Sequence, residues 1–202
     1  MKVRREIHKR KVIKIAGVSA KLFEKKGYLA TNMEEISSTA KISKGAIYYY
    51  FSKKEDILFF ILDVVIDALL GDLEAQLEEI GSSASKVQFV ISRHLEIYSK
   101  NVAECKVLLY DSHCLPRRKF EVIAEKERKY YRIVSGVLSE FLGGDIQKEK
   151  LTAVTFALFG MCNWTYVWYD TRKSLTGEDV ANIFGTILMR GIKKVPEMKI
   201  AD

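Results

Sequence analysis

Proline, cysteine and histidine are scarce in this chain of 202 residues, which contains 2, 3 and 3 of them. The near absence of proline leaves long stretches free to form helices, because proline disrupts a helix interior. The cysteines are odd in number and form no Cys-x-x-Cys pair, which argues against a disulfide framework and against a structural zinc site. We therefore expect Cys105, Cys114 and Cys162 to be reduced thiols of an intracellular protein.

Sequence patterns typical of enzymes are also absent. The chain contains no Gly-x-Ser-x-Gly, no His-Glu-x-x-His, no phosphate-binding loop and no dinucleotide fingerprint. Its histidines, His8, His94 and His113, do not cluster in the sequence. We predict that the protein is not an enzyme and that it has no cofactor and no metal site.

Only one segment is long and apolar enough to require a membrane test. Residues 151–169 contain no charged residue, and 19 residues nearly span a bilayer. Polar Thr152, Thr155, Asn163 and Thr165 favour instead a helix buried in a core or at a dimer interface. The basic N-terminus is not followed by a long apolar run, so we expect no signal peptide and a cytoplasmic protein without membrane contact.

Positive charge is concentrated at one end of the chain, whose overall net charge is +7. Residues 1–54 contain 14 Lys and Arg against 4 Asp and Glu, whereas residues 55–202 contain 19 against 22. The excess of +10 in the first segment predicts a polyanionic partner for that segment. A solvated, basic first helix is the alternative.

Apolar residues recur at helical spacing through the chain, and no strand alternation occurs. The predicted fold class is all-α. Residues 1–54 form a three-helix, helix-turn-helix DNA-binding domain with the motif at about 32–51, and residues 55–202 form a larger helical bundle for effector binding and dimerisation. The later helices are expected at 87–103, 106–114, 117–142, 148–170 and 176–193.

Local start and stop signals define the first helices. A helix over residues 3–26 ends at Gly27. The capping box Thr31-Asn32-Met33-Glu34 opens the second helix and Ser43 caps the third. A second box, at residues 52–55, opens a long helix that reaches about residue 81.

The third helix, within SKGAIYYYF (43–51), carries three successive tyrosines. Ile47 and Phe51 are four residues apart, so they share one face and anchor the helix inward. Three successive residues fan over about 200° of a helix, so the tyrosines cannot all point inward. Exposed phenols suit DNA, because the hydroxyl binds phosphate oxygens and the ring contacts thymine methyls. Packing of the tyrosines against the first helix is the alternative.

The segment GYLATNMEEISSTAKISKGAIYYYFSKKEDIL resembles the DNA-binding segment of the TetR family of bacterial transcriptional regulators. The resemblance covers residues 15–58, and Asn32, Ser37 and Tyr50 replace the commoner Thr, Ala and His. It implies DNA-contact roles for Thr31, Ser43, Lys44, Gly45, Tyr48, Tyr49, Tyr50 and Lys54.

The resemblance also implies a homodimer, in which the last two helices of each subunit form a four-helix bundle. Two recognition helices then read a palindromic site in double-stranded DNA. We predict that the dimer interface contains Phe184, Gly185, Leu188 and Gly191, with small residues permitting close approach. Filling of a monomer core by these residues is the alternative.

The stretch NWTYVWYDTR (163–172) resembles, more loosely, a segment of TetR-type regulators of fatty-acid, aromatic-acid and sterol catabolism, several of which respond to acyl-CoA thioesters. An indole and a guanidinium four residues apart suit an adenine or a phosphate if the helix extends that far. An aromatic core residue beside a solvated arginine is the alternative. The predicted effector-binding residues are Trp168, Arg172, Trp164, Asn163, Tyr98, His94 and Arg93.

These features together predict a ligand-responsive, sequence-specific DNA-binding regulator. In the role usual for the family it is a repressor, released by a small apolar or acyl-CoA-type effector that prefers the state with the wrong helix spacing. The alternative is a helical-bundle scaffold or a membrane-associated protein without DNA binding. That alternative leaves the basic first segment and its capped helices unexplained.

Overall fold

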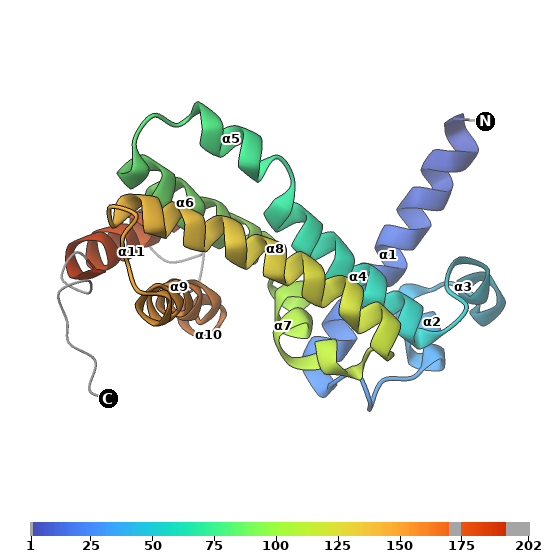
Figure 1. Ribbon diagram of the computed structural model, residues 1–202. Coiled ribbons are helices and arrows are strands. Elements are labelled where there is room, and N and C mark those ends of the chain that lie inside the picture. The colour runs from blue at the N-terminus through green and yellow to red at the C-terminus, as the bar shows by residue number, and fades with distance from the viewer. Residues whose placement is uncertain (1, 170–174, 193–202) are drawn as a thin grey trace. The chain divides into compact units, whose positions relative to one another are not determined.

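The structure, a computed structural model, describes residues 2–169 and 175–192, with side chains from residue 6 onward. Within these ranges the chain forms helices and no strand, which confirms the all-α prediction (Figure 1). None of the described helices is both long and apolar enough to cross a membrane.

The helices divide into two compact units, Met1–Ala68 with Asn101–Lys126, and Leu69–Lys100 with Glu127–Asp202. The divisions fall inside α4 (Lys54–Leu70) and inside α8 (Arg117–Phe141), so each of these helices supplies residues to both units. The boundary between a DNA-binding and an effector-binding domain, expected at residue 54, stays a prediction, because the two compact units are divided at other residues.

The first unit is built on α1. Its elements are α1 (Lys2–Lys26), α2 (Met33–Ala40), α3 (Lys44–Tyr50), most of α4, α7 (Val102–Asp111), the short 3-10 helix η1 (Ser112–Cys114) and the start of α8. Helices α2 and α7 pack against α1 (Figure 1). Ile15, Phe23, Ile36, Ile47 and Ile57, which come from α1, α2, α3 and α4, are buried, and each such burial stabilises the fold by about 2 kcal/mol.

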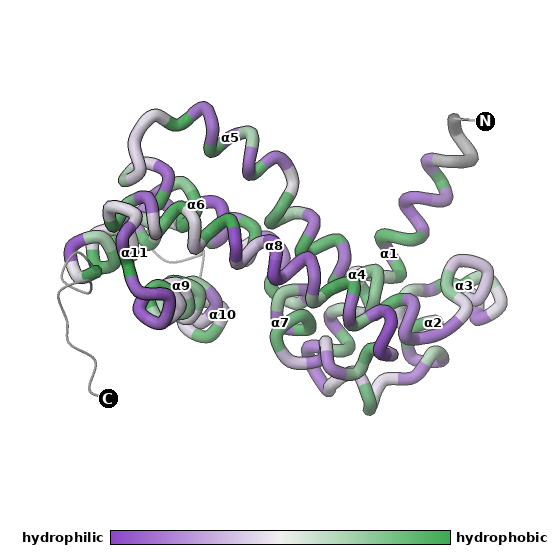
Figure 2. Tube along the Cα trace, in the orientation of Figure 1, coloured by the Kyte–Doolittle hydropathy of each residue, from purple (hydrophilic) through white to green (hydrophobic). Residues whose placement is uncertain are grey.

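The second unit is built on α6 (Ser83–Lys100). Its other elements are α5 (Leu73–Glu79), the rest of α8, α9 (Lys148–Asn163), α10 (Thr165–Trp168) and α11 (Gly177–Ile192). Helices α9, α10 and α11 all pack against α6, whose Val87, Ile91 and Leu95 are buried at helical spacing. Along α8, hydrophilic and hydrophobic residues alternate, as expected for a helix with one face in a core (Figure 2).

Two helices predicted as continuous are broken in the structure. The long helix after the tyrosines ends at Leu70, because Gly71 adopts a positive φ of 30° that no helix contains, and α5 follows. The predicted helix 148–170 is divided at Trp164, where the hydroxyl of Thr165 donates to the carbonyl of Cys162 at 2.6 Å and competes with the regular helix bonds.

The start of the last helix follows the sequence signal. The hydroxyl of Thr176 accepts a hydrogen bond from the backbone N–H of Asp179 at 3.1 Å, and the Asp179 carboxylate accepts one from the Thr176 N–H at 2.9 Å. This reciprocal pair is a capping box, and it begins the last helix where the sequence predicts a helix start, at residue 176.

Candidate DNA-binding surface and effector site

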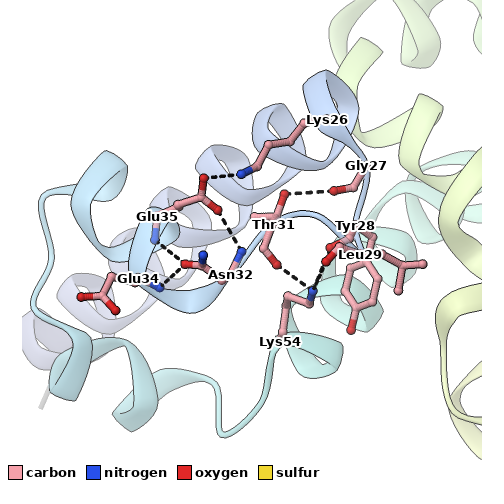
Figure 3. A network of polar contacts seen from close by, with 9 residues as sticks. All are labelled: Lys26, Gly27, Tyr28, Leu29, Thr31, Asn32, Glu34, Glu35 and Lys54. Atoms are coloured by element: carbon pink, nitrogen blue, oxygen red, sulfur yellow. Dashed lines mark hydrogen bonds and ion pairs between the residues drawn. The ribbon is translucent and has the colours of Figure 1, made fainter.

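The start of α2 positions the helix-turn-helix, and its cap lies one residue later than predicted. The side-chain oxygen of Asn32 accepts from the N–H groups of Glu34 and Glu35, both at 3.0 Å. The Glu35 carboxylate accepts from the Asn32 N–H at 3.0 Å (Figure 3). Thr31 is buried, and its hydroxyl donates to the Gly27 carbonyl at 3.0 Å. Thr31 therefore supports the turn and presents no exposed hydroxyl for a phosphate.

The turn between α2 and α3 reverses the chain without a glycine. Lys41 adopts the left-handed conformation with φ of 52°, and its N–H bonds to the Ser38 carbonyl at 3.2 Å. The hydroxyl of Ser37 donates to the carbonyl of Ile42 at 2.7 Å and holds the far side of the turn. The hydroxyl of Ser43 then accepts from the backbone at residue 46 at 3.3 Å, which confirms the predicted cap of α3.

Helix α3 has one buried seam and one open face. Ile47 and Phe51 are buried, as predicted for the inward anchors. Tyr48 and Tyr49 are 45% and 71% exposed. Gly45 is exposed too, and no atom lies within 4 Å of the position a Cβ would take there, so the backbone is accessible at this point. The open face suits close approach to a groove of DNA.

Tyr50 is placed differently from its two neighbours. It is half-buried, and its ring centroid lies 4.9 Å from that of His8 on α1. The Tyr49 ring lies 6.2 Å from the same imidazole and 5.1 Å from the Tyr50 ring. Packing of tyrosine on the first helix, the alternative considered from the sequence, therefore occurs at Tyr50 while Tyr48 and most of Tyr49 remain open.

Lys44 stands at the exposed start of α3. Its ammonium lies 3.5 Å from a carboxylate oxygen of Glu34, and both side chains are more than half exposed. An exposed ion pair of this kind contributes little to stability, because water screens it. The Lys44 ammonium is therefore accessible to an anionic ligand.

Lys54, predicted to hold a DNA phosphate, is turned inward (Figure 3). Its ammonium donates to the carbonyls of Tyr28 at 2.8 Å and Thr31 at 2.7 Å, with that of Leu29 at 3.5 Å. It also lies 4.2 Å from the centroid of the Tyr28 ring, in a cation–π contact. Burial lowers the pKa of Lys54 and raises that of Tyr28 to about 12. Lys54 thus ties the start of α4 to the turn before α2.

Comparison with known proteins decides what kind of protein this is. Residues 15–60 match the model of the bacterial regulatory proteins of the tetR family. Residues 81–192, more than half of the chain, match the model of the tetracyclin repressor-like C-terminal domain. The chain belongs to the TetR family. It is therefore a DNA-binding transcriptional regulator of bacterial type, with an N-terminal helix-turn-helix and a C-terminal helical domain.

Individual relatives agree with this assignment over nearly the full length. The fatty acid metabolism regulator protein of Bacillus subtilis is 27% identical over 190 residues, which are 90% of this chain and 95% of that protein. The crystal structure of a TetR-family regulator from Bordetella parapertussis superimposes with a TM-score of 0.85 at 24% identity, covering 94% and 98% of the two chains. That of AibR with isovaleryl coenzyme A and operator DNA superimposes with a TM-score of 0.76 at 22% identity, covering 89% and 98%.

The second unit of this TetR-family protein contains a buried polar cluster around His94. The Asn163 side-chain oxygen, which only accepts, lies 2.8 Å from Nε2 of His94, so Nε2 carries the proton. Nδ1 then accepts from the hydroxyl of Tyr130 at 3.0 Å. The ring of Tyr98 stacks on the imidazole at 4.3 Å and that of Phe159 lies at 6.0 Å. Burial lowers the pKa of His94 to about 4, so the imidazole is neutral.

Three of the predicted effector residues, His94, Tyr98 and Asn163, thus come together from α6 and α9. Tyr130 on α8 and Phe159 complete the cluster, and sequence reasoning missed both. They lie 36 and 65 residues from His94, and no spacing rule connects positions so far apart.

The remaining predicted effector residues do not join this cluster. The guanidinium of Arg93 is held by the Leu69 carbonyl at 3.3 Å, the Gln76 side chain at 3.1 Å and the Asp72 carboxylate at 3.2 Å. The indoles of Trp164 and Trp168 are exposed. Helix α10 ends at Trp168, so it does not extend to Arg172, which lies outside the described residues.

A cleft of about 440 Å³ opens on the same unit between α6, α10 and α11. Its lining includes Ser92, Leu95, Glu96, Thr165, Tyr169 and Val180. Hydroxyl groups and an apolar floor suit an uncharged ligand of modest size. The carboxylates of Glu96 and Glu178, which also line it, do not suit phosphate groups.

The residues predicted for the dimer interface divide into two sets. Gly185 and Leu188 are buried within the chain itself, and the Gln88 side chain of α6 occupies the space that a Cβ at Gly185 would need. The small residue therefore admits the Gln88 side chain of α6, and the interface role predicted for these two positions stays a prediction. Phe184 is half-buried, with its ring 6.2 Å from that of Trp168, and Gly191 is exposed.

Proposed function

We propose that this TetR-family protein is a homodimeric repressor of the bacterial cytoplasm that binds a palindromic operator and is released by a small apolar or acyl-CoA-type effector. The observation that carries the proposal is α3, a capped helix anchored by Ile47 and Phe51 with Tyr48 and Tyr49 exposed. The basic charge of residues 1–54 supplies the attraction to phosphates.

The proposed contacts follow from exposure. Tyr48, Tyr49 and Gly45 face the groove, and Lys44 and the Ser43 cap hold phosphates at the start of α3. Thr31 and Lys54 act as positioning residues, because their polar atoms are bonded to main-chain carbonyls. Tyr50 holds α3 against His8.

An exposed apolar face supports the homodimer. Large apolar side chains of α9, α10 and α11, helices that pack against one another, remain exposed. They are Phe156, Trp164, Val167, Trp168, Ile183 and Ile187. An apolar patch of this kind marks a protein–protein interface. We assign the dimer interface to these residues together with Phe184 and Gly191.

The proposed effector site is the region around His94 and the cleft of α6, α10 and α11, which would hold the acyl part of the effector and leave the phosphates of a coenzyme A outside. The neutral imidazole, whose two nitrogens are bonded to Asn163 and Tyr130, disfavours a charged group here, so we place the uncharged acyl part of the effector in this region. Support for an acyl thioester comes from AibR, solved with isovaleryl coenzyme A, and from the name of the Bacillus subtilis fatty acid metabolism regulator.

The test is operator binding by the full-length protein, using fragments of the DNA upstream of its own gene at two salt concentrations. Replacing Tyr48 and Tyr49 together by alanine should weaken binding about 100-fold, because each lost base or phosphate contact is worth about 1–3 kcal/mol. Replacing Lys44 by alanine should lower the salt slope by about 1. Tyr110→Ala, at an exposed position on α7, is the matched control and should bind as the wild type does.

Effector release is measured in the same assay with a series of acyl-CoA thioesters from isovaleryl to long-chain. Release by one of them, lost in an Asn163→Leu variant, would support the effector class. Failure of every thioester with intact DNA binding would refute it. Equal affinity of wild type and the double tyrosine variant for every fragment would contradict the DNA-binding proposal itself.

A further inference from the structure

A groove of about 840 Å³ lies in the first unit, between α1 and α4, and the proposed function leaves it unused. Its walls are formed by Val12, Ile13 and Ala16 of α1 and by Phe60 and Val64 of α4, among others. Ile13 and Val64 are 55% and 49% exposed although both are apolar. A concave apolar space of this size lies within the range of small-molecule sites.

The lining includes a carboxylate to which none of the described residues is bonded. Glu104, in the first turn of α7, is half-buried, and no hydrogen bond or ion pair reaches its side chain from the described part of the chain. A half-buried carboxylate favours a hydrogen-bond donor, since it has lost part of its water. Glu6 is paired with Arg10 at 3.8 Å and Lys9 adds one ammonium, so it is Glu104 that disfavours an anionic ligand beside it.

Both walls of the groove contact the recognition helix. His8 lines the groove. The centroid of its ring lies 6.2 Å from that of Tyr49 and 4.9 Å from that of Tyr50. On the α4 side, the ring of Phe60 lies 5.7 Å from that of Phe51, the residue that ends α3. A molecule bound between α1 and α4 would therefore contact the two helices whose side chains pack against α3.

We propose that this groove binds a small, uncharged apolar molecule with one hydrogen-bond donor, the donor bonded to Glu104, and that its occupancy weakens operator binding. An occupant that spreads α1 from α4 separates His8 from the tyrosines, and by linkage whatever prefers the spread state lowers affinity for DNA. The site is distinct from the effector site proposed in the second unit. Only the DNA part of the inference rests on the proposed function.

Two fluorescent probes of nearly the same shape test the site. N-phenylnaphthylamine is uncharged and has one N–H donor, and anilinonaphthalenesulfonate has the same skeleton with an added sulfonate. The wild-type protein should bind the uncharged probe saturably, at one per chain, and at least about tenfold more tightly than the sulfonate. Glu104→Gln should reduce this preference, because it removes the negative charge and keeps an acceptor.

A matched pair of glycine variants locates the probe. Gly17 lines the groove and Gly136 lines a different cleft, in the second unit. No atom lies within 4 Å of an added Cβ at either position, so a leucine fits without a clash at Cβ and favours the helix. Gly17→Leu should weaken binding of the uncharged probe at least about tenfold, and Gly136→Leu should leave it unchanged. Val64→Phe fills the groove from α4 as an independent second variant.

Three results would overturn the site: no saturable binding of the uncharged probe, equal binding in Gly17→Leu and wild type, or loss of binding in Gly136→Leu instead.

Coupling between the groove and DNA is measured as the operator dissociation constant with the groove saturated by N-phenylnaphthylamine. We expect a rise of about tenfold in wild type and none in Gly17→Leu, and an unchanged constant in wild type would overturn the coupling. If wild type binds no operator, the proposed function fails while the probe experiment still decides the site.

Discussion

In the helix-turn-helix of the first unit, Asn32 and Ser43 bond to main-chain groups close in sequence, whereas the buried cluster of the second unit joins side chains across long sequence separations. Asn32 and Ser43 satisfy helix N–H groups within three residues of themselves. His94 instead bonds to Tyr130 and Asn163, which are 36 and 69 residues away.

This difference suits what each unit is proposed to do. Bonds to neighbouring main-chain groups fix the helix ends and leave the open face of α3 free to present a constant surface to DNA. A buried side-chain network has few alternative partners, so a ligand that replaces one member changes the packing of several helices at once. The first arrangement favours rigidity and the second favours response.

The largest effect is expected from protonation of His94. Its pKa is about 4 in the folded protein and about 6.5 when unfolded. The neutral form therefore stabilises the fold fully above pH 6.5, and this stabilisation is lost as the pH falls toward 4. The loss is about 3 kcal/mol in the free energy of unfolding, measured by urea denaturation between pH 7.5 and 4.

Two variants sharpen this prediction. His94→Gln keeps a donor and an acceptor without a titrating group, so its stability should fall less than that of the wild type across the same pH range. His113→Gln, at an exposed position, is the matched control and should follow the wild type. If His94→Gln and wild type lose the same free energy of unfolding as the pH falls, protonation of His94 is not the cause of the loss.

Lys54 is an exception to this comparison, because its side chain bonds to residues of the helix-turn-helix that are distant in the sequence. Its bond to the Thr31 carbonyl joins residues 23 apart. Lys54→Met keeps the aliphatic stem and removes the charged donor from several carbonyls. It should lower the free energy of unfolding by about 2 kcal/mol.

The salt dependence of operator binding separates the two roles considered for Lys54. A positioning residue weakens binding without changing the salt slope, whereas a lost phosphate contact lowers the slope by about 1. Lys53→Met removes a neighbouring lysine that is 72% exposed and provides the control for charge alone. A lower salt slope of operator binding in Lys54→Met than in Lys53→Met would indicate that Lys54 contacts a DNA phosphate after all.

The sequence was a good guide to most local signals, although it placed the cap of α2 one residue too early. Caps at Ser43 and Thr176 and the buried pair of Ile47 and Phe51 follow from spacings of three and four residues. The ring of Tyr130 against His94 and the carbonyls around Lys54 were missed, because only folding brings these positions together. A break such as that at Gly71 is also poorly marked, since a glycine within a helical pattern can continue it.

The cap of α2 offers a smaller effect and a matched comparison. Asn32→Ala should lower the free energy of unfolding by about 1 kcal/mol, the usual effect of removing a capping oxygen. Glu34 and Glu35 stand in the same first turn and interact alike with the helix dipole, but only Glu35 closes the capping box, and it also pairs with Lys26. Thermal unfolding should show Glu35→Ala less stable than Glu34→Ala. The reverse order would place the box at Thr31 and Glu34, as the sequence alone suggested.

The smallest effect on stability is expected at Glu34, and it is informative for that reason. Its pair with Lys44 is exposed on both sides, so Glu34→Gln should change the free energy of unfolding by less than about 0.5 kcal/mol. The same substitution removes a negative charge beside the open face of α3 and releases the Lys44 ammonium. Operator affinity should therefore rise about two- to fivefold at low salt, and the gain should shrink as salt screens the charges.

Glu178→Gln makes the same charge change in the second unit and should leave operator affinity unaltered. A tighter operator complex in both variants would reflect net charge alone, whereas a gain confined to Glu34→Gln would place Lys44 at a phosphate.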